Sequence, residues 1–284
     1  MKQFKALLIL GLLFIGAQAK DEPWLVDVGI SSIQNVRDGG IRALYKGQDA
    51  ASFDKPAGQE KFYFGVFDGH GKTGGEVSQY IYSRLLKQLQ ATDCTDEDIV
   101  KVVGAMQEEL KDNEDAWKSG STAVFAIFDW QAKNFKIANI GDSRLLVVRK
   151  GKEVFSTRDH KVNDPQELQK ILPGGCVKNG YLYDEKQKYG LAITRTLGDC
   201  YLYTHGAPLS CEPDITDVAI KKGDIVILAS DGLWDVMDNQ QVMEFVCSLL
   251  KQGKRITDVA DMLVAHARKL DSWDDITALL VILG

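Results

Sequence analysis

The segment Lys61–Gly71 reads KFYFGVFDGHG and joins a predicted strand to a polar turn. Its first seven residues are rich in aromatic and branched side chains, a composition typical of a β-strand. The chain then changes to Asp68, Gly69, His70 and Gly71. The sequence therefore predicts that a carboxylate and an imidazole lie together at the end of a rigid element. The glycines beside them allow a ligand or a carbonyl group to approach closely.

The composition of the whole chain is typical of one large globular domain. The 284 residues are 45% hydrophobic and 26% charged, with a formal net charge of −6. The basic cluster Lys221–Lys222 is too short to follow a phosphate backbone. We therefore expect no nucleic-acid partner, and we expect the protein to be a monomer.

The N-terminus has the pattern of a secretory signal peptide. Lys2 and Lys5 precede an apolar run over residues 6–17, and residues 17–19 (AQA) form a small-residue cleavage pattern. The run is shorter than the roughly 20 residues that cross a bilayer. We predict that residues 1–19 are removed, that residues 20–284 form a single domain, and that the product is secreted or lumenal without stable membrane insertion. A buried N-terminal helix of the mature fold is the alternative.

The five cysteines form no C-x-x-C pair, so the sequence supports neither a zinc site nor a redox motif. One or two disulfides could form in an oxidising compartment, but the spacing indicates no particular pairing.

Outward from the central segment, strand patterns alternate with pairs of amphipathic helices. Strands are expected over residues 26–33, 36–45, 123–128, 135–140, 145–149, 153–157, 191–194, 215–220, 225–229 and 276–283. Helices are expected over residues 77–89, 95–110, 165–171, 240–250 and 258–270. Thr95 with Asp98 is expected to form a capping box for the second, and Asn239 and Thr257 are expected to cap the last two. Polar loops are expected over residues 52–59 and 159–188, the second as a flap with a hairpin at Asn179–Gly180. The first loop is expected to bring Asp49 and Asp68 to neighbouring strand ends. Short turns between successive strands predict antiparallel meanders.

Aspartates recur where these predicted strands end. The set comprises Asp49, Asp68, Asp142, Asp231 and Asp274. Each one alone is equally typical of a solvated turn, but clustered carboxylates raise one another's pKa unless cations neutralise them. Oxygen ligands without surplus histidine or thiolate select Mg²⁺ or Mn²⁺. Two such ions about 4 Å apart can orient a water molecule for attack on phosphorus.

These residues stand within an ordered series of motifs. The series is Phe67-Asp68-Gly69-His70-Gly71, Ser119-Gly120-Ser121-Thr122-Ala123, Gly141-Asp142-Ser143-Arg144, Asp159-His160-Lys161, residues 191–199 (LAITRTLGD), residues 230–235 (SDGLWD) and Asp274-Asp275-Ile276-Thr277. The series resembles that of the type 2C metal-dependent Ser/Thr protein phosphatases, the PPM family, from about residue 26 to the C-terminus.

The resemblance implies an α+β fold, a central sandwich of two antiparallel β-sheets flanked by antiparallel helix pairs. It also implies hydrolysis of phosphoserine and phosphothreonine in proteins by attack of a metal-bridged water. Two Mg²⁺ or Mn²⁺ ions, with a third possible, would be held by Asp49, Asp68, the Gly69 carbonyl, Asp231 and Asp274, and the third by Asp142. His70 would be the general acid. Four further motif residues are interpreted as structural, namely His160, Arg195, Asp199 and Asp235.

One departure from the family pattern concerns substrate binding. The family usually has a phosphate-binding arginine five residues before the position of Asp49, and this chain has Leu44 there. Arg42 or Lys46 could supply the charge from the same segment. If neither does, the alternative is a catalytically weak pseudophosphatase that acts as a phosphoprotein-binding or regulatory module. A further alternative is an enzyme for small phosphomonoesters.

Overall fold

The computed structural model describes residues 26–33, 47–55, 60–171 and 176–284. Its strands are β1 (Val26–Ile33), β2 (Asp49–Asp54), β3 (Lys61–Gly71), β4 (Ser119–Ser121), β5 (Ala123–Asp129), β6 (Asn134–Ile140), β7 (Arg144–Arg149), β8 (Lys152–Ser156), β9 (Cys176–Lys178), β10 (Tyr181–Tyr183), β11 (Gly190–Leu191), β12 (Leu197–Gly198), β13 (Asp214–Ala219), β14 (Ile225–Ala229) and β15 (Ile276–Leu283). Its helices are α1 (Gly74–Leu89), α2 (Asp96–Lys111), α3 (Pro165–Ile171), α4 (Cys200–Thr204), α5 (Asp231–Trp234), α6 (Asn239–Lys251) and α7 (Ile256–Lys269), with a 3-10 turn at Glu114–Ala116.

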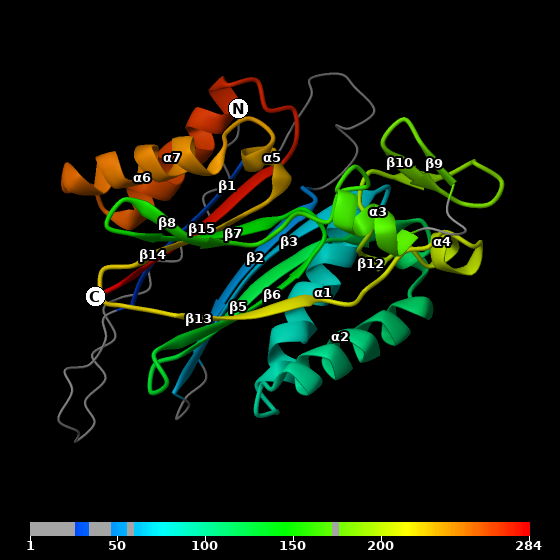
Figure 1. Ribbon diagram of the computed structural model, residues 1–284, viewed down its shortest axis with the longest axis horizontal. Coiled ribbons are helices and arrows are strands. Elements are labelled where there is room, and N and C mark those ends of the chain that lie inside the picture. The colour runs from blue at the N-terminus through cyan, green and yellow to red at the C-terminus, as the bar shows by residue number, and fades with distance from the viewer. Residues whose placement is uncertain (1–25, 34–46, 56–59, 172–175) are drawn as a thin grey trace.

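Two antiparallel sheets form the centre of the molecule (Figure 1). In the described residues, one sheet has the order β1-β15-β14-β7-β8. The other has the order β12-β4-β3-β5-β6-β13, with β2 paired to β3. The antiparallel helices α6 and α7 cover the first sheet, and α1 and α2 cover the second. The predicted α+β sandwich with flanking helix pairs is confirmed.

Strand β3 is buried on both faces, which explains its almost continuous apolar sequence. Phe62, Phe64 and Val66 pack between the two sheets with residues of β14 and β15. The alternate residues Tyr63 and Phe67 pack against α1 and α2. Because side chains alternate across a strand, one segment supplies two cores. It also fixes the position of the polar residues that follow.

The helix ends follow from their caps, with two differences from the sequence-based expectation. The capping box at Thr95 is confirmed, since Asp98 N donates to Thr95 Oγ1 at 3.1 Å and Thr95 N donates to Asp98 Oδ2 at 3.0 Å. Helix α6 was expected to be capped by Asn239, but Asp238 is the cap because its carboxylate accepts the Gln241 N–H at 2.8 Å. Helix α7 begins at Ile256, before the expected start, and has no side-chain cap.

Several predicted strand boundaries were wrong. The polar tripeptide Asp68-Gly69-His70 lies inside β3, because β4 continues the pairing through Gly71. Part of the expected 52–59 loop belongs to β2, and of the expected strand over 191–194 only Leu191, in β11, and an isolated bridge at Ile193 are paired. The strands around Gly141–Arg144 do not form one meander, since β6 and β7 belong to different sheets. The hairpin at Asn179–Gly180 is confirmed, with both φ angles positive.

Some predictions fall outside the described residues. They are the signal peptide over 1–19, the strand over 36–45, and the substrate-binding candidates Arg42 and Lys46 together with Leu44. All five cysteines are free thiols in the structure. No helix in the described ranges is long and apolar enough to cross a membrane.

Candidate active site

Strand pairing between β2 and β3 places Asp49 directly opposite Asp68. The inferred proximity of these two carboxylates is therefore confirmed. The Asp68 backbone is fixed from the other side by Thr122, whose Oγ1 accepts the Asp68 N–H at 3.1 Å and whose N–H donates to Asp68 O at 2.9 Å. The backbone of the neighbouring Gly69 donates to Gln48 O at 3.1 Å. Asp68 and Gly69 are thus held between two segments, residues 48–49 and Thr122.

The other sheet supplies carboxylates to the same place. Asp231 follows β14, and Asp274 precedes β15, so that antiparallel pairing of β14 with β15 brings the two together. Asp142 lies on the connection between β6 and β7, where the chain passes from one sheet to the other. A pocket of about 420 Å³ is lined by Gln48, Asp68, Gly69, His70, Gly71, Lys72, Thr122, Asp142, Leu191, Ala192, Ile193, Asp231 and Asp274.

The electrostatics of this pocket disfavour unneutralised carboxylates. Burial, then the negative charge of Asp275, raises the pKa of Asp49 to about 7. Burial and the neighbouring carboxylates raise the pKa of Asp68 and of Asp231 well above the ordinary value. The carboxyl groups of Asp68 and Asp231 also lie within hydrogen-bonding reach of each other. In the metal-free protein, these carboxylates bind protons, which supply the positive charge that cations would otherwise supply.

Within the described residues, two buried carboxylate oxygens have no hydrogen-bond partner, Oδ1 of Asp49 and Oδ1 of Asp231. Such atoms are costly unless something else satisfies them. Among the described residues, no three His, Cys, Asp or Glu side chains form a ready ligand set for a single ion. The carboxylates instead surround a shared space, which cations and water would have to fill. Oxygen donors, raised pKa values and unsatisfied oxygens together fit a hard divalent cation.

Asp142 differs from the other acids because a lysine faces it. Lys161 Nζ lies 3.6 Å from Asp142 Oδ2 and 2.9 Å from Asp235 Oδ1. Burial raises the pKa of Asp142 to about 6, and the positive charge of Lys161 opposes that rise. Asp142 is therefore partly neutralised already, which suits a weaker ion site than the one beside Asp68.

His70 lines the pocket and is held by a residue that sequence reasoning interpreted as structural. Its Nε2 donates to Asp199 Oδ2 at 2.7 Å, and Thr196 Oγ1 donates to the same oxygen at 2.8 Å. Burial lowers the pKa of His70, but the charge and hydrogen bond of Asp199 outweigh burial and raise it. A Cβ at Gly120 would lie 2.1 Å from Asp199 Oδ2 and 2.7 Å from His70 Nε2, so only glycine fits there. The signal in the sequence that could have identified Asp199 is the TLGD motif at residues 196–199.

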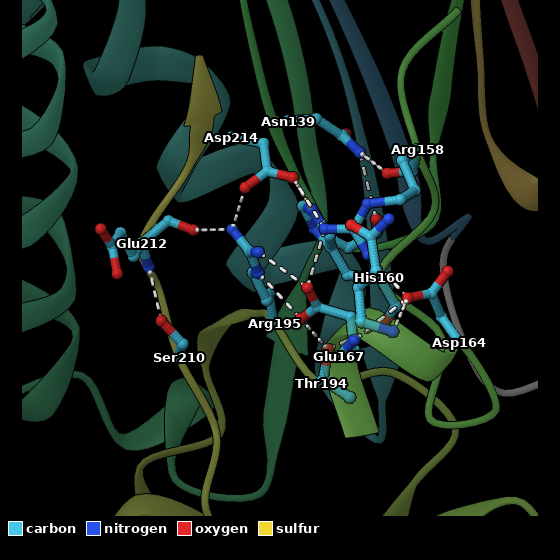
Figure 2. Close-up of polar contacts among 12 residues, drawn as sticks. Asn139, Arg158, His160, Asp164, Glu167, Thr194, Arg195, Ser210, Glu212 and Asp214 are labelled. Atoms are coloured by element: carbon cyan, nitrogen blue, oxygen red, sulfur yellow. Dashed lines mark hydrogen bonds and ion pairs between the residues drawn. The ribbon is translucent and has the colours of Figure 1, made fainter. Parts of the chain in front are cut away.

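His160 and Arg195 lie in a second polar cluster (Figure 2). Arg195 donates to both oxygens of Glu167 at 2.8 and 3.0 Å and to Asp214 Oδ1 at 2.7 Å. Arg158 donates to Glu167 and Asp214, and His160 Nε2 donates to Asp214 Oδ2 at 3.1 Å. These residues join α3 to β13 without lining the pocket. The geometry agrees with a structural interpretation of His160 and Arg195.

Comparison with known proteins gives this arrangement a context. Residues 26–276 match the family model described as Protein phosphatase 2C. The chain belongs to the protein phosphatase 2C family. Members of this family are metal-dependent serine/threonine phosphatases that use Mn²⁺ or Mg²⁺.

Individual members differ in how much of their length the chain covers. Protein phosphatase 2C homolog 1 of Saccharomyces cerevisiae is 30% identical over 244 residues, which are 78% of this chain and 82% of the yeast protein. Probable protein phosphatase 2C 27 of Oryza sativa is 29% identical over 236 residues, 77% of this chain but only 64% of the rice protein. A crystal structure of serine-threonine phosphatase 2C from Toxoplasma gondii superposes with a TM-score of 0.74 at 22% identity, covering 91% of this chain and 95% of that one. The similarity to the Toxoplasma gondii structure shows a shared fold and nothing further.

Proposed function

We propose that this protein is a Mg²⁺- or Mn²⁺-dependent phosphatase that hydrolyses phosphoserine and phosphothreonine monoesters in proteins. The observation that carries the proposal is one pocket that combines unneutralised carboxylates with an imidazole paired to Asp199. Family membership supports the same reaction class. Phosphoproteins are the corresponding substrates.

Asp68, Asp49, Asp231, Asp274 and the Gly69 carbonyl are the groups that would hold two cations, and Asp142 would hold a weaker third. Divalent cations bound there would neutralise the carboxylates and provide the Lewis acidity that activates water. The unpartnered oxygens of Asp49 and Asp231 support this assignment. Strand pairing fixes Asp49, and Asp231 begins the short helix α5 shortly after β14, so little rearrangement would accompany binding.

His70 would supply the proton that the leaving oxygen needs. Asp199 stabilises the protonated imidazole, and the raised pKa of His70 keeps that proton available near neutral pH. Because Nε2 is held by Asp199, Nδ1 is the ring nitrogen left to deliver it. The phosphoester oxygen is the proton acceptor.

Hydrolysis of a phosphothreonine peptide and of an aryl phosphate tests the proposal. Turnover of the peptide with Mn²⁺ or Mg²⁺, abolished by a chelator and restored by added metal, is the expected result. Bound metal without turnover of the peptide would contradict it and would favour the phosphoprotein-binding module. The complete set of pocket carboxylates and the paired His70 do not favour that alternative.

We also propose that the chain enters the secretory pathway. The support is the sequence pattern of residues 1–19, a basic start, a short apolar run and a small-residue cleavage pattern. Expression of the full chain in secretory cells should give a secreted product whose intact mass lacks those residues. An intracellular product that retains residue 1 onwards would contradict the proposal.

A further inference from the structure

The proposed substrate carries negative charge into a pocket whose own charge is negative. A phosphomonoester is a dianion near neutral pH. Two divalent cations contribute +4, and Asp49, Asp68, Asp231 and Asp274 contribute −4, so the sum is zero. Asp142 in the lining adds a negative charge that Lys161 partly offsets, so the centre with two cations has no excess positive charge for a dianion. A further cation beside the pocket would therefore improve substrate binding.

Lys72 is the one lysine or arginine that lines the pocket among the described residues. The nearby Lys161 is already engaged, since it faces Asp142 and Asp235. Lys72 is exposed, and no hydrogen bond or ion pair joins it to the part of the chain that the structure describes. Its ammonium group is therefore available to an incoming anion, whereas that of Lys161 neutralises the protein's own carboxylates.

The backbone on both sides of Lys72 is fixed. Before it, Gly71 has a φ of +85° and its carbonyl accepts Gln48 Nε2 at 2.7 Å. A Cβ at Gly71 would lie 2.6 Å from Ser119 Oγ, so glycine permits the turn. After it, Thr73 N donates to Ser119 Oγ at 3.0 Å and Thr73 Oγ1 donates to Asp115 O at 2.7 Å.

This turn connects the strand that carries Asp68 and His70 to helix α1. Lys72 is thus two residues from the imidazole, on a loop that cannot shift without breaking hydrogen bonds. A fixed backbone lowers the entropy lost when a flexible side chain engages a ligand. Lysine binds phosphate as a point charge and does not need the bidentate geometry of arginine.

We propose that Lys72 binds the phosphate group of the substrate and thereby sets substrate affinity. The inference rests on the proposed phosphatase function and adds a residue to it. Lys72 contacts the phosphate before and during the reaction, so its contribution to binding is the same in the ground state and in the transition state. It would act on every phosphomonoester, whatever the peptide sequence.

The test compares full-length Lys72→Gln with the wild type on an aryl phosphate and a phosphothreonine peptide, with inorganic phosphate as inhibitor. We expect KM for both substrates and Ki for phosphate to rise by about tenfold, with kcat within about twofold, because one charge-assisted contact is lost. Lys72→Arg should restore most of the affinity.

Lys87→Gln is the matched control, because it removes the same charge from an exposed lysine in the last turn of α1, the helix that follows Lys72. About 20 Å separate residues 72 and 87 along a helix of this length. Its KM and Ki should stay within about twofold of the wild type.

Calorimetric binding of inorganic phosphate to the metal-loaded protein separates failure of this inference from failure of the proposed function. If the wild type has no turnover but binds phosphate more tightly than Lys72→Gln, the phosphatase proposal fails and the role of Lys72 stands. Unchanged phosphate affinity in Lys72→Gln would overturn the inference. So would a rise in KM for the peptide alone, which would mean that Lys72 contacts a peptide carboxylate.

Discussion

The molecule contains two groups of acids whose surroundings shift their pKa values in opposite directions. At the pocket, Asp231 in its lining and Asp49 opposite Asp68 each keep an oxygen without a hydrogen-bond partner in the described residues, and burial raises the pKa of both. In the second cluster, the hydrogen bonds and charges of Arg195 and its neighbours outweigh burial and lower the pKa of Glu167, and His160 and Arg195 lower that of Asp214 (Figure 2).

This difference distinguishes acids that stabilise the fold from acids that serve the proposed reaction. Acids that are matched by arginines inside the chain stabilise it, and removal of one partner leaves an uncompensated charge. Acids without an internal counter-charge destabilise the metal-free chain, and this indicates that their role is to bind a ligand. The two clusters should therefore respond in opposite directions to neutralisation.

The largest effect is expected for Asp68→Asn. Turnover should fall by roughly a thousandfold, since the group at the centre of the proposed metal site loses its charge. The stability of the chelated protein should be unchanged or higher, because a buried carboxylate that repels its neighbours is removed. Activity assays and thermal unfolding in excess chelator measure the two quantities. A clear loss of metal-free stability would show that Asp68 is structural.

Glu167→Gln should have the opposite profile. Glu167 is 2% exposed and its partner Arg195 is 3% exposed, so the variant leaves a buried guanidinium without its carboxylate. We expect the free energy of unfolding to fall by about 3 kcal/mol, measured by urea denaturation. Glu108→Gln is the control, because its ion pair with Lys111 is on the surface and should contribute little to stability. Equal losses in the two variants would contradict the comparison.

Acid should weaken the second cluster before it affects the rest of the molecule. The pKa of Glu167 is lowered from 4.5, so its contribution is complete above that value and is lost as pH falls toward the folded-state pKa. Burial lowers the pKa of His160 from 6.5, so the unfolded chain takes up a proton first and stability also falls with pH.

Between pH 5 and pH 3 we expect the wild type to lose about 2 kcal/mol of stability relative to Glu167→Gln, measured by urea denaturation of both metal-free proteins. The pocket acids, whose pKa values are raised, stabilise the fold as pH falls, but they are the same in the two proteins and cancel from the difference. In Glu167→Gln, which is already less stable at pH 7, the further loss over the same interval should be smaller. Parallel plots of the free energy of unfolding against pH for the two proteins would mean that other groups control the change in stability in acid.

The parts predicted from the sequence are those with local signals. The content of aromatic and branched side chains located β3, and the capping pattern at Thr95 located α2. The proximity of Asp49 and Asp68 followed from two strand ends around one loop, although β2 and β3 proved to pair along their length. In these cases the residues that decide the structure are close in sequence or repeat with the period of the element.

The parts that were missed depend on contacts between distant segments. His70 and Asp199 are 129 residues apart, and no periodicity connects them. Glu167 reaches Arg195 from a short helix in an irregular region, where charge spacing carries no information about partners. Lys72 follows a well-marked motif, but only the folded pocket shows that it has no counter-charge in the described residues. Tertiary pairing of charges cannot be obtained from local pattern alone.

Asp199 combines features of both clusters, and its substitution gives the smallest of the expected effects. It is buried and hydrogen-bonded like the acids of the second cluster, yet its partner His70 lines the pocket. In Asp199→Asn, kcat should fall by about tenfold while KM and metal affinity stay unchanged, because the imidazole loses the charge that stabilises its protonated form. Thr196→Val removes the other side-chain hydrogen bond to Asp199 but leaves its charge, so it should lower kcat by about twofold. Steady-state kinetics and metal titration measure both variants. If Asp199→Asn lost stability as Glu167→Gln does and kept its kcat, the role of Asp199 would be structural, with no part in the reaction.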